Sequence, residues 1–156
     1  MTDTRAYLVA QFDSVCDGIR QQLDADRVTL RLDLPAHDLG VNLPAGESAG
    51  AEAPSLRAEA GLDQWTLDTV RWLVAERRPL VQDDFSAPPS PPEALLSIYK
   101  VSAQVLCPVF SHFPTVIGWL SVHQLTERHW TAEDLSYCTR AVARIDALIV
   151  AAGTSE

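Results

Sequence analysis

The sequence is poor in cysteine and has no pattern of metal ligands. Its three cysteines, Cys16, Cys107 and Cys138, lie far apart without a CxxC pair. An odd number of scattered cysteines suits a reducing compartment and does not fit a structural zinc site, so we expect free thiols. The four histidines show no ligand spacing such as HExxH. The sequence therefore predicts no metal site.

The chain is also short of basic residues and lacks long hydrophobic runs. It has 12 Lys and Arg against 21 Asp and Glu, which gives a formal net charge of -9. A surface of this sign repels phosphate backbones, so we expect no nucleic acid partner. No apolar run approaches the roughly 18 residues that span a bilayer, and charges interrupt the N-terminal segment, unlike in a signal peptide. We expect a cytoplasmic protein with no membrane partner.

The composition that remains is that of a globular protein. Hydrophobic residues make up 47% of the 156 residues and charged residues 21%. This balance is far from that of a disordered chain, and the length fits one domain of ordinary size. We therefore predict a single domain over residues 1–156, with its core between about residues 4 and 151.

Hydrophobic periodicity divides the N-terminal half into helices, a strand and a loop. Apolar residues at steps of three and four predict a helix over 4–24, and strict alternation over 27–34 predicts a half-buried strand. Residues 35–62, rich in Pro, Gly, Ala and acid, predict a long loop with one weak strand at 55–59. Helical spacing returns at 62–76.

The C-terminal half alternates between extended segments and helices. PLVQDDF predicts a short extended segment, and the four prolines of SAPPSPPE delay the next helix until ALLSIYKV. The β-rich runs 103–110 and 115–125 predict a hairpin. Thr131 and Asp134 form a variant capping box before a helix that extends to about residue 151. This order predicts an α+β fold, an antiparallel sheet flanked by helices on both faces.

Three motifs in the C-terminal two-thirds carry a family resemblance: ALLSIYKVSAQVLCPVF, IGWLSVHQ and RHWTAEDL. In order and spacing they resemble the GAF domains of cyanobacteriochromes and phytochromes over about residues 70–150, whereas the first 60 residues resemble them only by element order. The resemblance implies a GAF-like fold. In bilin-binding members a Cys-His pair opens the short helix before the Leu-Leu of this motif. Here Pro91 and Pro92 occupy those places, so we predict that no bilin is attached there covalently.

The resemblance also implies candidate ligand contacts. Asp83 matches an acidic residue near the chromophore of many members, and His123 lies in the strand motif; a turn cap and a sheet hydrogen bond are their structural alternatives. The two-residue period places Trp119, Ser121 and His123 on one strand face, where Trp119 and His123 would line a pocket for a flat ligand unless Trp119 is core. Tyr99 has the same two interpretations, ligand contact or core.

Catalysis is not expected. Cys107 lies in an apolar strand, and a buried thiol is a small hydrophobe rather than a nucleophile. The sequence has no Ser-His-Asp order, no paired-carboxylate motif and no phosphate loop. Some GAF domains resemble free-methionine-sulfoxide reductases, which need cysteines in loops, whereas the cysteines here fall on two predicted helices and a strand. We therefore predict that the chain is not an enzyme.

Two functional hypotheses follow from the resemblance. The first is a sensor or adaptor that has lost covalent bilin attachment and acts through protein-protein contacts, because no kinase, cyclase or DNA-binding segment follows residue 150. The alternative is a sensor domain that binds a small ligand noncovalently, either a tetrapyrrole or a nucleotide. No other cofactor is expected.

The two terminal helices carry the expected protein interface. Their apolar residues keep the spacing of a helix-packing seam, and two such stripes exceed what one sheet face is expected to cover. We therefore predict a homodimer, or a complex with another protein, through Leu8, Phe12, Val15, Ile19, Leu135, Cys138, Val142, Ile145 and Ile149. The alternative is a monomer in which both helices lie flat on the sheet.

Overall fold

The computed structural model describes residues 3–57 and 62–153. In chain order, the elements are α1 (Thr4–Leu23), β1 (Arg27–Leu32), η1 (Pro35–His37), β2 (Gly46–Ala49), η2 (Gln64–Thr66), α2 (Asp68–Glu76), β3 (Leu80–Gln82), α3 (Glu93–Ser97), β4 (Ala103–Val109), β5 (Gly118–Gln124) and α4 (Ala132–Ala152). The η elements are single turns of 3-10 helix.

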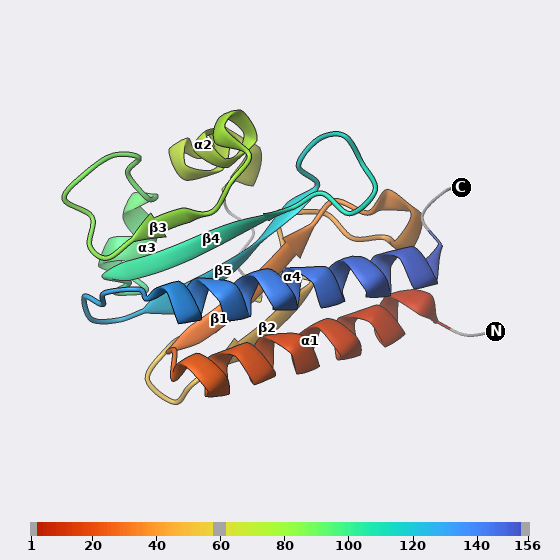
Figure 1. Ribbon diagram of the computed structural model, residues 1–156, viewed down its shortest axis with the longest axis horizontal. Helices are drawn as coiled ribbons and strands as arrows, with labels where there is room; N and C mark the ends of the chain where they lie inside the picture. The colour runs from red at the N-terminus through yellow and green to blue at the C-terminus, as the bar shows by residue number, and fades with distance from the viewer. Residues whose placement is uncertain (1–2, 58–61, 154–156) are drawn as a thin grey trace.

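The sheet has five antiparallel strands in the order β2-β1-β5-β4-β3 (Figure 1). The predicted hairpin is its centre, with Val105 of β4 opposite Val122 of β5. Helices α1 and α4 cover one face, and α2 packs on the other through Val70 and Leu73. The predicted α+β architecture, an antiparallel sheet flanked by helices, is confirmed.

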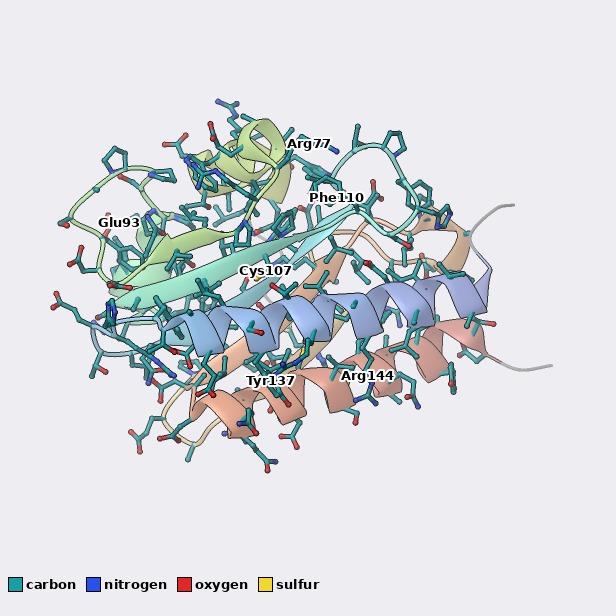
Figure 2. The ribbon with its side chains drawn as sticks, in the orientation of Figure 1. Arg77, Glu93, Cys107, Phe110, Tyr137 and Arg144 are labelled. Atoms are coloured by element: carbon teal, nitrogen blue, oxygen red, sulfur yellow. The ribbon has the colours of Figure 1, made fainter. Side chains whose placement is uncertain are left out.

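The terminal helices lie side by side along the sheet, and each begins at a side-chain cap. Asp3 accepts a hydrogen bond from the N–H of Ala6 at the start of α1. At α4, the hydroxyl of Thr131 and the carboxylate of Asp134 each accept the other residue's N–H at 3.1 Å, which is the predicted capping box. Tyr137 of α4 lies in the groove that α4 forms with α1 (Figure 2).

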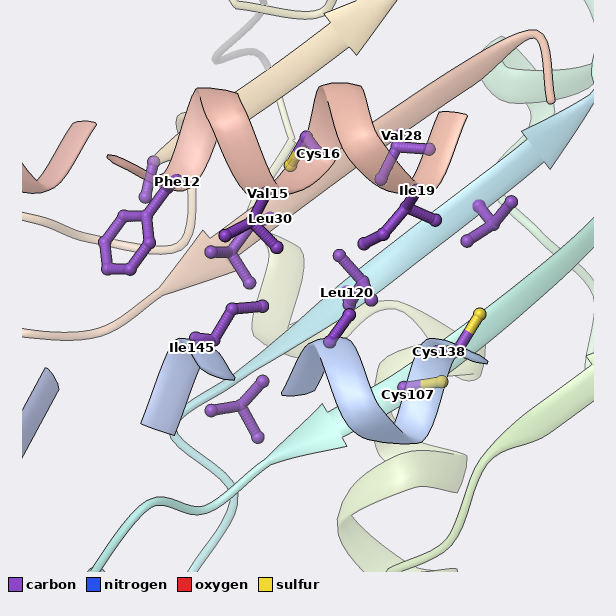
Figure 3. Packing of buried hydrophobic residues seen from close by; sticks show 14 of the residues in the cluster. Phe12, Val15, Cys16, Ile19, Val28, Leu30, Cys107, Leu120, Cys138 and Ile145 are labelled. Carbon is purple, nitrogen blue, oxygen red and sulfur yellow. The ribbon is translucent and has the colours of Figure 1, made fainter. Parts of the chain in front are cut away.

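The main core fills the space between this helix pair and the sheet. Phe12 of α1 and Ile145 of α4 point into it, together with Leu30 of β1 and Leu120 of β5 (Figure 3). All four side chains are fully buried. Burying a side chain of this size contributes about 1.5–3 kcal/mol. This cluster is the largest of those in the described residues, so this face of the sheet contributes most of the hydrophobic stabilisation.

The residues predicted as a protein interface belong to this core. Seven of the nine are buried and two, Leu135 and Val142, are half-buried against the same cluster: the buried ones are Leu8, Phe12, Val15, Ile19, Cys138, Ile145 and Ile149. The expected exposed seam is therefore wrong for these side chains, because one sheet face accommodates both apolar stripes. The expected association itself, with a second copy or with another protein, stays a prediction.

Three boundaries in the first half differ from expectation. β1 ends at Leu32, and the strand that pairs with it is β2, Gly46–Ala49, rather than 55–59. Residues 55–57 lie outside any strand, and 58–59 lie outside the described residues. Gly46 allows β2 to approach α1, since a Cβ there would lie 2.7 Å from Cβ of Phe12. α2 begins only at Asp68, after the turn η2.

β1 was expected to be half-buried, but all six of its residues are buried. Alternate residues face the apolar core. Arg27, Thr29 and Arg31 face the other side, where loops and short helices cover them. The prediction was wrong because sequence alternation records which residues are polar and not which residues are covered.

The substitution Ile145→Glu tests the placement of this helix face. It puts an unpaired charge into the core, so we expect a loss of more than about 3 kcal/mol in the free energy of unfolding. Val150→Glu is the matched control on the same helix, because Val150 is 59% exposed. It should change stability by less than about 0.5 kcal/mol. Urea unfolding followed by circular dichroism measures both; an Ile145→Glu protein with wild-type stability would contradict the packing.

Candidate functional site

A cavity of about 230 Å³ lies on the face of the sheet opposite α1 and α4. Its walls come from η2, α2, α3 and the neighbouring loops, and they are mostly apolar. Its floor is formed by side chains of β1, β4 and β5: Thr29, Arg31, Gln104, Leu106, Trp119, Ser121 and His123. The arrangement of an apolar wall over a few convergent polar groups is typical of small-molecule sites.

Strand register brings the polar floor residues together. Arg27 lies opposite His123, and Thr29 lies opposite Ser121, in the β1–β5 pairing. On the other side of β5, Gln104 of β4 is the partner of His123. Because directly paired residues project to the same face of a sheet, these side chains form one continuous polar surface.

Arg27 is fully buried and organises this surface. Its Nε donates to Nδ1 of His123 at 3.1 Å, and its Nη1 donates to the carbonyl of Pro54 at 2.8 Å. The guanidinium lies over the ring of Tyr99, 5.4 Å from its centroid. Its Nη2 is buried and has no hydrogen-bond partner in the described part of the chain. One cation thus joins β1, β5, a loop and the segment after α3.

His123 is held in its neutral form. Burial, together with the positive charges of Arg27 and Arg31, lowers the pKa of His123 well below its ordinary value of 6.5. Because Nδ1 accepts a hydrogen bond from Arg27, the proton of the neutral ring is on Nε2. The ring can therefore donate one hydrogen bond on its Nε2 side.

Arg31 lines the cavity as a second buried cation. Its Nη1 donates to the carbonyl of Val41 at 2.9 Å. Burial lowers the pKa of Arg31 to about 10, which leaves the side chain charged at neutral pH. Within residues 3–57 and 62–153, neither Arg27 nor Arg31 forms a salt bridge. The negative charge of Glu47 favours the charged form of both arginines, but its carboxylate accepts hydrogen bonds from Ser55 Oγ and Leu56 N instead.

An amide chain connects the floor with the proline-rich segment. Gln104 Nε2 donates to Gln82 Oε1 at 2.9 Å, and Gln82 Nε2 donates to the carbonyl of Pro89 at 2.8 Å. Pro91 is buried, and Pro92 precedes α3 and lines the cavity. Of the two prolines named in the sequence, Pro92 therefore lies at the wall of the site and Pro91 precedes it, buried.

Three of the four candidate ligand contacts lie at the cavity. Tyr99, Trp119 and His123 all line it. Trp119 is also a core residue, since it packs in the second buried cluster and meets the ring of Trp65 edge-on, with centroids 5.5 Å apart. Trp119 is therefore both a core residue and a residue of the cavity wall.

Asp83 lies away from this cavity, so the structure does not place it with the other three candidates, and its role as a ligand contact stays a prediction. Its carboxylate accepts the N–H of Trp130 at 3.1 Å, and its Oδ2 lies 2.9 Å from Nδ1 of His129. These contacts lower the pKa of Asp83. Asp83 therefore fixes the segment that leads into α4 and does not reach the cavity.

Sequence reasoning missed four polar residues of the site: Arg27, Thr29, Arg31 and Gln104. The first three were the polar half of an alternating strand, which usually faces solvent. A signal was present in the sequence, because two of only 12 basic residues, Arg27 and Arg31, lie four positions apart on one face of a predicted strand.

The cysteines lie on the opposite side of the sheet. Cys16, Cys107 and Cys138 are all free and buried in the core under α1 and α4 (Figure 3). A hydrogen bond with Cys138, together with burial, raises the pKa of the Cys107 thiol well above its usual value. No described thiol lines the cavity.

Comparison with known proteins now identifies the family. The GAF domain family matches residues 8–146, which is most of the chain, so the protein belongs to the GAF domain family. The comparison with curated proteins finds no match. The resemblance inferred from the three sequence motifs is confirmed.

Solved structures with this fold include light-absorbing GAF domains of cyanobacteria. The blue-light absorbing form of the PixJ GAF domain of Thermosynechococcus elongatus has a TM-score of 0.73 and 21% identity, over 97% of this chain and 92% of that one. The phycocyanobilin-bound GAF domain of a cyanobacterial phytochrome has a TM-score of 0.72 and 17% identity, over 93% and 85%. At these identities, the likeness establishes the fold alone.

Two further classes of site are absent from the described residues. None of their helices is both long and apolar enough to cross a membrane. Over the same residues, no group of three or more His, Cys, Asp or Glu side chains is placed to hold a metal ion. The cavity is therefore the candidate functional site of the described residues.

Neutral His123 predicts a specific dependence of stability on pH. The pKa of His123 is depressed in the folded state, so below about pH 6.5 the unfolded chain binds a proton that the folded chain does not bind. The free energy of unfolding therefore decreases as the pH is lowered. We expect His123 to lower the free energy of unfolding by about 1.4 kcal/mol when the pH is lowered from 7.5 to 5.5. Urea unfolding of wild type and His123→Gln, compared at the two pH values, should show that difference. Parallel pH dependences of the two proteins would rule out a neutral buried imidazole.

Proposed function

We propose that this GAF domain is a non-catalytic sensor that binds a small molecule noncovalently in the cavity. The observation that carries the proposal is the cavity itself: buried polar groups converge on one side, and an apolar wall faces them. Buried polar groups are costly unless a partner satisfies them. Arg31, which lines the cavity and uses one guanidinium donor on Val41, has further donors that a bound molecule would accept from.

The placement of the thiols and prolines supports the loss of covalent bilin attachment. The comparison structures include phycocyanobilin-bound and phycoerythrobilin-bound GAF domains. In this chain, Pro91 and Pro92 stand before α3, and neither can form a thioether. The three cysteines face the other side of the sheet. A tetrapyrrole would therefore have to bind without a covalent bond.

The size of the cavity favours a ligand smaller than a tetrapyrrole. Pockets for drug-sized molecules occupy about 300–1,000 Å³. The cavity here measures about 230 Å³, below that range. The noncovalent tetrapyrrole and the nucleotide thus both fit less well than a smaller molecule.

A binding role also suits the chemistry of the cavity better than catalysis. The one imidazole that lines it, His123, has its lone pair on Nδ1 engaged by Arg27, so it cannot act as a general base without losing that bond. No described Cys, Asp or Glu lines the cavity. The groups present can orient and hold a ligand, and none is activated as a nucleophile.

The adaptor hypothesis retains one specific surface, which we propose as the route to a partner protein. A groove of about 220 Å³ lies between α1 and α4, on their sides away from the sheet. Gly18 leaves it open on α1, and Tyr137, Arg140 and Arg144 line it from α4 (Figure 2). We therefore expect a homodimer to form through this groove and not through the buried apolar stripes of the two helices.

Blocking the cavity tests the sensor proposal. Ala94 of α3 lines the cavity, whereas Ser97 of the same helix is exposed and does not. Thermal unfolding with a panel of neutral, anionic and cationic single-ring compounds should find stabilisation of wild type and Ser97→Phe that Ala94→Phe abolishes. Stabilisation that persists in folded Ala94→Phe, or a panel without any binder, would contradict a small-molecule site in this cavity.

Co-production with a bilin tests the loss of covalent attachment. We expect no zinc-induced fluorescence at 17.1 kDa on a denaturing gel, because no thiol faces the cavity. A fluorescent band would refute this, and its loss in Cys107→Ala would identify the attachment site.

A further inference from the structure

The cavity carries positive charge that no described acidic side chain pairs in a salt bridge, although the carboxylate of Glu47 lies close enough to act on it. No Asp or Glu occurs among its described lining residues, although the chain has 21 acidic residues and a net charge of -9. Arg31 lines the cavity, and Arg27 lies behind His123. Removing a charge from water without a counter-ion costs several kcal/mol, so this arrangement favours an anion as the missing partner.

The hydrogen-bond inventory of the two guanidiniums leads to the same class of ligand. Each guanidinium carries five N–H donors. Arg31, which lines the cavity, uses one donor on Val41. Arg27 does not line the cavity, so its buried Nη2, which has no partner in the described residues, marks an unsatisfied charge behind the floor and not a ligand contact. A carboxylate has two oxygens in the geometry that matches the fork of an arginine.

Two hydroxyl groups stand beside Arg31. Thr29 lies two residues before it on β1, and Ser121 lies opposite Thr29 on β5; both line the cavity. A carboxylate seated on Arg31 can accept hydrogen bonds from hydroxyls of this kind. The neutral ring of His123, with its proton on Nε2, adds a further donor to the same floor.

The wall opposite this floor is suited to an apolar body. Leu67 and Val70 line it from the α2 side, and Leu95 and Ile98 line it from the α3 side. Ile98 is 63% exposed, which is unusual for a large hydrophobic residue beside a cavity. A cavity of about 150 Å³ is known to hold a benzene ring. The volume here, about 230 Å³, leaves room for such a ring and a short acidic group.

We propose that the cavity binds a small carboxylate with a single-ring or similarly compact apolar body, its carboxylate on Arg31 and its ring between α2 and α3. This inference rests on the proposed sensor function and names the ligand class of the same site. Arg27 keeps His123 neutral and adds its charge from behind. Thr29 and Ser121 fix the orientation of the carboxylate.

Calorimetric titration of the full chain with phenylacetate, benzamide, phenylphosphonate and benzylamine tests the charge requirement. Phenylacetate should bind at least tenfold more tightly than each of the other three, and its affinity should fall as salt increases. Benzamide or benzylamine binding as tightly as phenylacetate would leave a ligand-binding cavity but overturn the anion assignment. Tighter binding of phenylphosphonate would overturn the carboxylate assignment. Absence of binding by all four would contradict the proposed function as well.

Matched arginine substitutions test the assigned residue. Arg31→Gln should weaken phenylacetate binding at least tenfold and leave benzamide binding unchanged. Arg71→Gln, on the exposed side of α2, is the control and should change neither. Thermal unfolding without ligand shows whether Arg31→Gln is folded. If it is not, Arg31→Lys replaces it, and it should still bind phenylacetate more weakly than wild type, because the fork geometry is lost. Wild-type affinity in a folded Arg31 variant would overturn the proposal.

Discussion

The buried guanidinium of Arg27 is the constraint around which the cavity side of the sheet is built. It donates to His123 across the β1–β5 pair and to Pro54 in the loop after β2, and it lies over the ring of Tyr99. Each of these contacts satisfies part of a charge that cannot reach water. Together they fix the tautomer of His123 and hold β1, β5 and the loop after β2 together behind the cavity floor. Losing any of these contacts would leave a buried cation still less satisfied, so they favour this arrangement of the floor.

The two faces of the sheet have different physical roles. The face under α1 and α4 is apolar, contains all three cysteines and supplies the stability of the domain. The opposite face buries Arg27, Arg31 and His123, which costs stability. A GAF domain can accept this cost because its first face alone forms a continuous core. Residues of the polar face can therefore differ between GAF domains without loss of the fold. In this chain, the fold forms with no thiol at the cavity.

The sequence was most informative where one element alone determines the pattern. The α1 and α4 helices and the β4–β5 hairpin follow from local periodicity, and Thr131 caps α4 as expected. β2 was missed because GESA has no apolar alternation, and its pairing depends on the contact of Gly46 with Phe12. Trp119 and His123 were found through the strand period. Arg31 was missed because its cover comes from distant segments. The contacts of Asp83 could not be foreseen because its partners lie 46 and 47 residues away.

A crystal structure of the protein with phenylacetate tests the central claim, that unpaired arginine charge makes this cavity a site for a small carboxylate. The account predicts the ring between α2 and α3 and the carboxylate within hydrogen-bond distance of the Arg31 guanidinium, with the Arg27–His123 contact intact. A ring bound with its carboxylate toward the cavity mouth and away from Arg31, or bound only in the groove between α1 and α4, would contradict it.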